Sequence, residues 1–249
     1  MEIELSPRRG RIELLDLIRG LTLISMILYH LCYNLYYLFG LRAQLIWYPS
    51  AIGGFWQETI CVSFLILAGA CTHFMRRPYL RAFKLAGCAL LITVVTWIAM
   101  PGELIVFGIL HCMTLCTLFF AVCRPLLRRI PPAAGLFLSV LFYVVTFSVP
   151  YGTLGIGSLS TALPRSWYVS YWLSIFGFLS PDFFSADYFP IFPYLFVFLS
   201  GYYLYPYIAA LPERLRGLRC APLNFLGRHS LIIYLLHQPV LYGAMLLLF

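Results

Sequence analysis

Long apolar runs dominate this chain and decide what it can fold into. Each run is roughly 20 residues long, which is the length that an α-helix needs to cross a hydrocarbon core about 30 Å thick. The runs cover residues 15–38, 55–75, 79–99, 103–123, 133–150, 190–211 and 229–248. They predict an all-α fold, a polytopic helical membrane bundle of about seven transmembrane helices.

The composition supports a membrane protein without a soluble part. Hydrophobic residues make up 62% of the chain and charged residues only 10%, far below the charge content of a soluble domain. We therefore expect residues 1–249 to form a single integral membrane domain. The weakest region, 151–189, is rich in Gly, Pro, Ser and aromatic residues. Within it, residues 165–179 suit an interfacial or re-entrant helix, and a short eighth span is the alternative.

Arginine and lysine fall almost entirely on one side of the predicted helices. With the N terminus inside, only Arg42 and Arg165 of the 17 basic residues lie outside. Cytoplasmic flanks carry such an excess, so the N terminus is predicted to be cytoplasmic. Orientation and anionic lipid then account for the +8 net charge, and we expect no nucleic-acid partner. The first run lacks a small-residue cleavage pattern, so we expect it to stay as a signal anchor.

Small and sulfur-containing residues point to packing. The eight cysteines lie singly in apolar runs or their flanks, and Cys112 and Cys116 have a helical spacing rather than a CxxC spacing. We expect free thiols and no metal. Small residues at 68–70 and 200–201 are typical of close helix packing.

Arg19 and His30 lie in the first run, where a lipid-facing position is costly. Their eleven-residue separation places both on one face of a helix, roughly 16 Å apart along its axis. Asp16 and Asn34 lie near the same stripe. Ionisable groups at membrane depth usually face a bundle interior or a wet cavity, so this stripe predicts a functional site. The alternative is an Asp16/Arg19 anchor with one hydrogen-bonded core histidine.

Two more histidines lie inside predicted spans. His111 is about 12 Å along the run that starts at Glu103, on the face it shares with Glu103, and its depth matches that of His30. We expect His30 and His111 to meet in one outward-lying cavity. His237 lies about 12 Å from the cytoplasmic side and is expected to line the inner half of the same channel.

The chemistry of imidazole assigns roles to these residues. A neutral imidazole near pH 7 takes a proton from an attacking amine or hydroxyl. We therefore predict His30 and His111 as catalytic residues, with Asn34 orienting the ring or holding the acceptor. The alternative for each lone histidine is a packed, hydrogen-bonded core residue.

Charged side chains at the two membrane faces suggest ligands. Cationic groups at the cytoplasmic helix ends suit a phosphate-bearing donor, although such arginines also set topology. The candidates are Arg19, Arg76, Arg77, Arg124 and Arg228. On the outer side, Glu103, Asp182 and Asp187 are the predicted partners of a cationic or polyhydroxy acceptor, and a solvated loop is the alternative.

Four ordered blocks resemble the signature blocks of the heparan-alpha-glucosaminide N-acetyltransferase catalytic-domain family, in its short bacterial form. The blocks read RIELLDLIRGLTLISMILYH, FGILHCMTL, SADYFPIFPYLFVFLSGYYL and LNFLGRHSLIIYLLHQPVL. The spacing of Arg19 and His30 also resembles the first-helix motif of membrane acyltransferases that O-acetylate surface glycans. In those relatives an acyl group from cytoplasmic acyl-CoA reaches a sugar on the far side of the membrane.

The resemblance carries functional roles onto individual residues. It implies Arg19 and His30 as the motif pair, and more weakly it implies His111 and Asp187. It extends, again more weakly, to Ser230, His237 and Gln238, which we predict to bind the donor. The animal members of the family are longer, have a lumenal domain, and have Asn where His30 stands, with a histidine farther along. The role of His30 therefore follows the surface-glycan acetylases more closely, and the heparan substrate is not inherited.

The leading hypothesis is an enzyme that moves an acetyl or short acyl group from acyl-CoA to an extracytoplasmic sugar, amino sugar or other small acceptor. We expect it in a bacterial cytoplasmic (inner) membrane, surrounded by lipid. The alternatives are a transporter or permease that uses the same polar stripe, and a non-catalytic membrane subunit. The sequence leaves open the acceptor, an acyl-histidine intermediate, and whether the chain forms a homo-oligomer.

Overall fold

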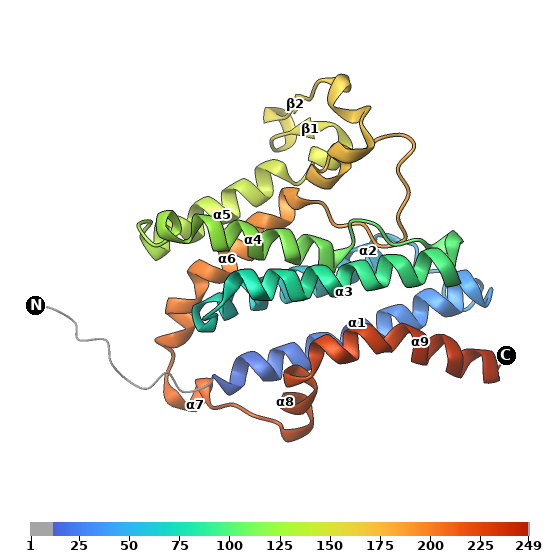
Figure 1. Cartoon of the computed structure of the whole chain (residues 1–249), viewed down its shortest axis with the longest axis horizontal. Coiled ribbons are helices and arrows are strands. Elements are labelled where there is room, and N and C mark those ends of the chain that lie inside the picture. Colours follow the sequence, from blue (N-terminus) through green and yellow to red (C-terminus); the bar gives the residue numbers. More distant parts are fainter. Residues whose placement is uncertain (1–11, 249) are drawn as a thin grey trace, which may run out of the picture. The chain divides into compact units, whose positions relative to one another are not determined.

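The computed structural model describes residues 12–248, which are mostly helical (Figure 1). The helices are α1 (Glu13–Tyr33), α2 (Ala51–Ala70), α3 (Pro78–Ala99), α4 (Ile109–Leu127), α5 (Pro132–Thr146), α6 (Ile191–Ala209), α7 (Glu213–Arg216), α8 (Ala221–Arg228) and α9 (Ser230–Leu248). Two short strands, β1 (Thr153–Leu154) and β2 (Thr161–Ala162), pair antiparallel. α3 and α5 begin at prolines, because the first helical position needs no backbone N–H.

Seven helical segments in the described part of the chain are long and apolar enough to cross a membrane. They are Glu13–Leu38, Ala51–Phe74, Pro78–Ala99, Ile109–Leu127, Pro132–Tyr151, Ile191–Ala209 and Ser230–Leu248. The predicted all-α polytopic bundle and its number of spans are therefore confirmed.

Residues 165–179 do not form the interfacial or re-entrant helix that the sequence predicts. Two separate 3₁₀ turns, Arg165–Tyr168 and Tyr171–Phe176, occupy this stretch. Gly177 ends the second turn with a φ of 104°, a left-handed conformation that only glycine adopts easily. The region is a folded loop, and it contributes no eighth span.

α4 begins six residues later than predicted. Glu103 ends a 3₁₀ turn, and Phe107 has a φ of 55°, which an α-helix does not accommodate. The intervening backbone pairs with a distant loop instead: the N–H of Phe189 donates to the carbonyl of Phe107 at 2.8 Å. The prediction that Glu103 shares a helix face with His111 is therefore wrong.

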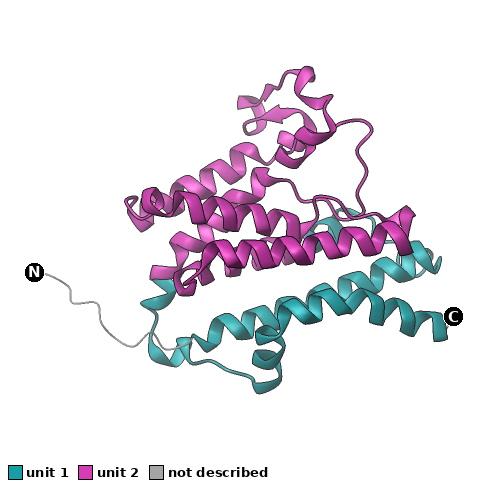
Figure 2. Cartoon of the chain, viewed as in Figure 1, with its two compact units in different colours: residues 1–57, 207–249 teal, residues 58–206 magenta. Residues whose placement is uncertain are grey.

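The chain divides into two compact units (Figure 2). Unit 1 comprises Met1–Gln57 and Tyr207–Phe249, and unit 2 comprises Glu58–Pro206. Unit 1 thus holds α1 and α7–α9, and unit 2 holds α3–α5, both strands and most of α2 and α6. The single domain expected over residues 1–249 stays a prediction.

Glycines bring helices into backbone contact within unit 2. A Cβ on Gly69 of α2 would overlap the backbone of Phe198, and a Cβ on Gly201 of α6 would overlap the backbone of Ile66. The close packing predicted for residues 68–70 and 200–201 is therefore confirmed. It lets α2 and α6 approach each other without intervening side chains.

Unit 1 uses the same device between α1 and α8. A Cβ on Gly20 would overlap the carbonyl of Leu223, and a Cβ on Gly227 would overlap the carbonyl of Asp16. The short helix α8 therefore lies directly on the first turns of α1. Because α9 follows α8 almost directly, this contact also places the first turn of α9 beside α1.

Candidate functional site

The polar stripe of α1 faces the interior of unit 1. Asp16 and Asn34 are buried, as are the apolar residues Leu23 and Met26 on the same face. Arg19 and His30 are partly exposed. The helical spacing of these residues therefore corresponds to one inward-facing surface.

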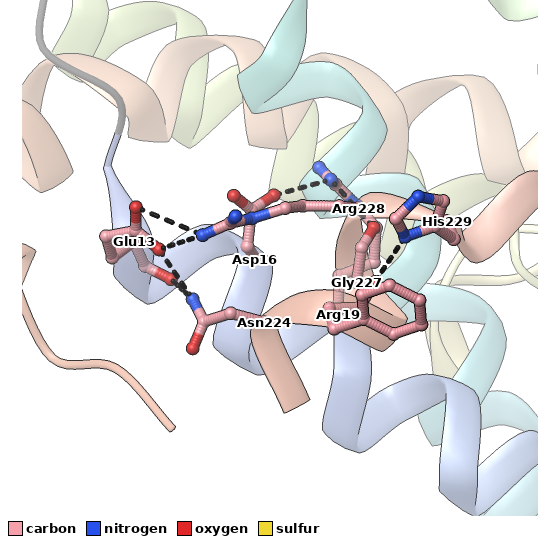
Figure 3. A network of polar contacts seen from close by, with 8 residues as sticks. Glu13, Asp16, Arg19, Asn224, Gly227, Arg228 and His229 are labelled. Carbon is pink, nitrogen blue, oxygen red and sulfur yellow. Dashed lines mark hydrogen bonds and ion pairs between the residues drawn. The ribbon is translucent and has the colours of Figure 1, made fainter. Parts of the chain in front are cut away.

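Arg19 is held at the α8 end of this stripe (Figure 3). Its Nη1 lies 3.1 Å from Asp16 Oδ1, one turn earlier on α1, and 3.5 Å from the carbonyl oxygen of Gly227. Gly227 lies in the last turn of α8, where carbonyl groups lack helical partners and favour cations. Arg19 thus takes part in fastening α8 to α1.

Glu13 makes a second link between α8 and α1 (Figure 3). Arg228 Nη2 lies 3.1 Å from Glu13 Oε2. The buried Asn224 donates through Nδ2 to the Glu13 backbone carbonyl at 2.8 Å and to Oε2 at 2.9 Å. Of the five arginines predicted to bind a donor, Arg19 and Arg228 therefore pair with carboxylates.

His30 and His237 lie in contact farther along α1 and α9. Their ring centroids are 4.8 Å apart and the ring planes are nearly perpendicular, at 74°. Each Nδ1 faces a carbonyl of its own helix, 2.9 Å from Met26 O for His30 and 2.5 Å from Tyr234 O for His237. Because a carbonyl only accepts, the proton of each neutral ring belongs on Nδ1, which leaves a lone pair on Nε2.

The Nε2 atom of His237 is buried and has no hydrogen-bond partner among residues 12–248. Its residue exposes only 8% of its surface. Buried polar atoms are nearly always paired, so an unpaired one in a helical membrane protein marks a functional candidate.

The position of His237 corrects its predicted place in the inner half of a channel. It lies level with His30 because α8 folds onto the first turns of α1 and α9 starts beside them. The sequence argument placed the start of the last helix at the membrane surface, and so put His237 too close to that surface. Ser230 is the first residue of α9.

Asn34 and Gln238 meet beside the histidine pair. Asn34 Nδ2 donates to Gln238 Oε1 at 3.0 Å. Asn34 is 1% exposed and begins a π-helical turn, Asn34–Leu38, a feature that often occurs at functional sites. Four predicted site residues are therefore neighbours: His30 on α1, Asn34 in the π-helical turn that follows it, and His237 and Gln238 on α9.

Aromatic side chains surround the His30 side of the pair, and the sequence argument missed them. The Tyr29 ring packs edge-on against His30 at 5.7 Å and contacts Tyr48 at 5.1 Å. Trp56 also packs on Tyr29, and its Nε1 donates to Ser25 at 2.8 Å. Burial raises the pKa of the Tyr48 hydroxyl, which therefore stays protonated at neutral pH. The high density of aromatic residues between 29 and 56 could have indicated this cluster from the sequence.

His111 lies in the first turn of α4, within unit 2. Thr93 Oγ1 donates its single proton to the carbonyl of Ile105 at 2.8 Å, so the 3.3 Å contact with His111 is made by a donating Nε2–H. Since His30 belongs to unit 1, the meeting of His30 and His111 stays a prediction.

The three predicted acceptor carboxylates have different surroundings. Asp187 accepts the backbone N–H of Ile109 at 3.2 Å through Oδ2, and so caps the N terminus of α4. Asp182 is exposed in the loop before it, and Glu103 ends the 3₁₀ turn ahead of α4. Their role in acceptor binding stays a prediction.

Glu58 is an intramembrane carboxylate that the sequence argument missed. Its Oε1 accepts the hydroxyl of Tyr143 and its Oε2 accepts the hydroxyl of Tyr194, both at 2.8 Å. These bonds join α2 to α5 and α6. Glu58 is the only charged residue between 55 and 75, which alone should have marked it.

Metal ligands do not gather in the described part of the chain: no three His, Cys, Asp or Glu side chains between residues 12 and 248 come close enough to hold an ion. Cys112 and Cys116 lie side by side on α4 with their sulfurs 3.9 Å apart. Arg76 and Arg77 are exposed between α2 and α3.

Seven apolar helices with ionisable groups inside them define a multi-pass membrane protein with a polar site among its helices. The sequence model of one family, described as heparan-alpha-glucosaminide N-acetyltransferase, catalytic, matches residues 11–239. The chain belongs to this family, whose members in general use acetyl-CoA, and it is in general terms a membrane acetyltransferase. No curated protein and no solved structure matches the chain.

Proposed function

We propose that the protein transfers an acetyl or short acyl group from cytoplasmic acyl-CoA to an extracytoplasmic sugar or amino sugar, with His30 as the general base. The contact between His30 and His237 is the observation that carries this proposal. Two imidazoles with their Nδ1 atoms turned to carbonyls offer basic Nε2 atoms inside one helical unit. A packed core histidine needs no second imidazole beside it.

The proposed transfer needs no reagent besides the acceptor and acyl-CoA. The acceptor oxygen or nitrogen attacks the thioester carbonyl with its lone pair, and Nε2 of His30 takes the O–H or N–H proton as the new bond forms. The C–S bond breaks, and the departing CoA thiolate takes the proton from the imidazolium, which restores the base. Asn34, Gln238 and the unpaired Nε2 of His237 are near enough to His30 to orient the reacting groups.

The remaining predicted site residues are proposed to bind the donor or the acceptor. The cytoplasmic arginines Arg19, Arg76, Arg77, Arg124 and Arg228, with Ser230, serve the donor. Glu103, Asp182 and Asp187 serve the acceptor, and His111 is the second candidate for the base. A bacterial cytoplasmic membrane, with the N terminus inside, places donor and acceptor on opposite sides.

The test is transfer from labelled acetyl-CoA to a panel of sugars and amino sugars by the purified protein. His30→Gln keeps hydrogen bonding but has no titratable base, so we expect it to lose about 10²–10⁴-fold in rate. His111→Gln is the matched control in unit 2, and thermal unfolding of both variants shows whether they fold. If His30→Gln retains wild-type turnover while His111→Gln loses it, the base is His111.

A further inference from the structure

Apart from Arg165, charges of opposite sign occupy opposite ends of unit 2. Its four carboxylates lie where α4 and α6 begin: Asp187 caps α4, and Glu58 bonds Tyr194 in the first turn of α6. The other two are Glu103 and Asp182, just before these helices. At the other end, where α4 ends and α3 begins, lie Arg76, Arg77, Arg81, Lys84, Arg124, Arg128 and Arg129. Tyr79 joins these helix ends, because its hydroxyl donates to Ala121 O at 3.4 Å.

Arg124 is the partly buried member of this basic end. Its guanidinium carbon lies 6.0 Å from the centroid of the Phe120 ring, one turn earlier on α4. Its Nε is buried and has no hydrogen-bond partner among residues 12–248. Both ion pairs found within this range, at Arg19 and Arg228, belong to unit 1. Arg124 is therefore a partly buried cation that makes no ion pair with a carboxylate among residues 12–248.

Tyr202 of α6 lies beside this cation. Phe120 lies between the two, because its ring contacts both the Arg124 guanidinium and the Tyr202 ring. The Tyr202 ring stacks on the His73 imidazole at 4.7 Å and contacts Phe120 at 5.3 Å. His73 Nε2 also lies 2.9 Å from the Tyr202 carbonyl, and Tyr202 is only 8% exposed. The hydroxyl is therefore positioned by packing on both sides of its ring.

We propose that Arg124 and Arg128, with the hydroxyl of Tyr202, bind a phosphate ester at this end of unit 2. A guanidinium presents a planar fork of N–H donors that matches phosphate oxygens, and a phenol adds one more donor. At Arg19 or Arg228 a phosphate has to displace Asp16 or Glu13, whereas Arg124 makes no ion pair among residues 12–248. The sequence argument could not rank these arginines, because their pairing depends on α8 and α6.

Two sources supply such a phosphate: the ribose 3′-phosphate and 5′-diphosphate of acyl-CoA, and the headgroup of an anionic lipid. The first source rests on the proposed function, and the second does not. Adenosine 3′,5′-bisphosphate and phosphatidylglycerol are the probes that separate them. Adenosine 3′,5′-bisphosphate carries two of the three CoA phosphates without the thioester, and phosphatidylglycerol carries a lipid phosphate without the nucleotide.

The nucleotide arm titrates adenosine 3′,5′-bisphosphate into the full chain in lipid-free detergent micelles, by calorimetry. We expect Arg124→Gln and Arg128→Gln to weaken binding about ten- to a hundredfold, the loss typical of a charge-assisted contact. Tyr202→Phe keeps the ring stack and should weaken binding several-fold. Arg129→Gln is the matched control, because it removes an exposed charge from the same helix end, and its affinity should stay within about twofold of wild type. Arg124→Lys keeps the charge without the fork and covers the case in which Arg124→Gln does not fold.

The lipid arm measures phosphatidylglycerol retained by the same proteins, by native mass spectrometry after exchange from vesicles of that lipid. One outcome is that Arg124→Gln loses the retained lipid, Arg129→Gln keeps it, and the wild type binds no nucleotide. This outcome supports a lipid phosphate at the site and removes acyl-CoA from the proposed function. Nucleotide binding that depends on Arg124, with no transfer activity in any assay, keeps the site while the proposed transfer fails. If Arg124→Gln and Arg129→Gln behave alike in both arms, the proposal is overturned.

Discussion

At the scale of single residues, Glu58 shows how an isolated carboxylate is accommodated among apolar helices. Each of its oxygens accepts a phenol hydroxyl, one from α5 and one from α6. Tyrosine suits this role, since its ring packs among aliphatic side chains while its hydroxyl reaches a polar partner. Glu58 and its two tyrosines therefore form a polar link within unit 2.

We predict that Tyr194→Phe lowers the free energy of unfolding of detergent-solubilised protein by about 0.6–2 kcal/mol, the range measured for hydrogen bonds between membrane helices. Tyr143→Phe should have an effect of similar size. Thermal unfolding measures both. Tyr151→Phe is the control, because Tyr151 is 80% exposed and its hydroxyl makes none of the hydrogen bonds within residues 12–248. Equal unfolding temperatures for Tyr194→Phe and Tyr151→Phe would contradict this view of Glu58.

The sequence could identify individual polar residues but not their partners. Helical spacing alone placed Asp16, Arg19, His30 and Asn34 on one face, and that face is buried apart from the partly exposed Arg19 and His30. The contact of His30 with His237 depends on how far along α1 the first turn of α9 lies. No local sequence pattern contains that information. For the same reason the sequence did not show that Arg19 pairs with Asp16 next to the end of α8.

At the scale of elements, the short helix α8 decides the position of α9 in unit 1. It lies on α1 because Gly20 and Gly227 leave no side chain between the two backbones. Asn224 and Arg228 then bind Glu13. A change that lifts α8 from α1 should therefore disturb His237 as well.

We predict that Gly227→Ala destabilises the protein by about 1–3 kcal/mol, the usual cost of forcing extra atoms into a packed contact. The added methyl would meet backbone atoms of Asp16, which cannot rotate away. Gly243→Ala on α9 is the control, because its added Cβ meets no atom within 4 Å beyond the nearby backbone of its own helix. Alanine also favours a helix by about 1 kcal/mol relative to glycine. Thermal unfolding gives the difference, and faster tryptic cleavage after Arg219 would report detachment of α8. A Gly227→Ala protein as stable as Gly243→Ala would show that the two helices are not in close contact.

Elements were predictable where their signal is local. Apolar length located all seven spans, because a membrane helix needs an uninterrupted apolar run. The start of α4 was missed because Phe107 turns away to pair with Phe189, which lies 82 residues farther along the chain (189 − 107). The loop around residues 165–179 was missed for a related reason, since its turns are set by packing and by Gly177.

At the scale of the whole molecule, orientation is the prediction that the arginine asymmetry carries. Cys220 provides a native reporter, because it is the one exposed cysteine of the eight. We predict that an impermeant maleimide labels Cys220 only after cells are permeabilised, while Ser158→Cys is labelled in intact cells. Each cysteine is tested alone, with the others replaced by alanine or serine. Labelling of Cys220 in intact cells would reverse the assigned orientation.

The opposite charges at the two ends of unit 2 make it an electric dipole. In the bacterial cytoplasmic membrane that we propose for this protein the inside is negative, and in the predicted orientation the arginine end faces that negative side. Each charge that had to cross the membrane against a potential of 100 mV would cost about 2.3 kcal/mol. Inverting the folded unit would move both groups of charges the unfavourable way at once and only Arg165 the favourable way, so the membrane potential would itself favour the predicted orientation.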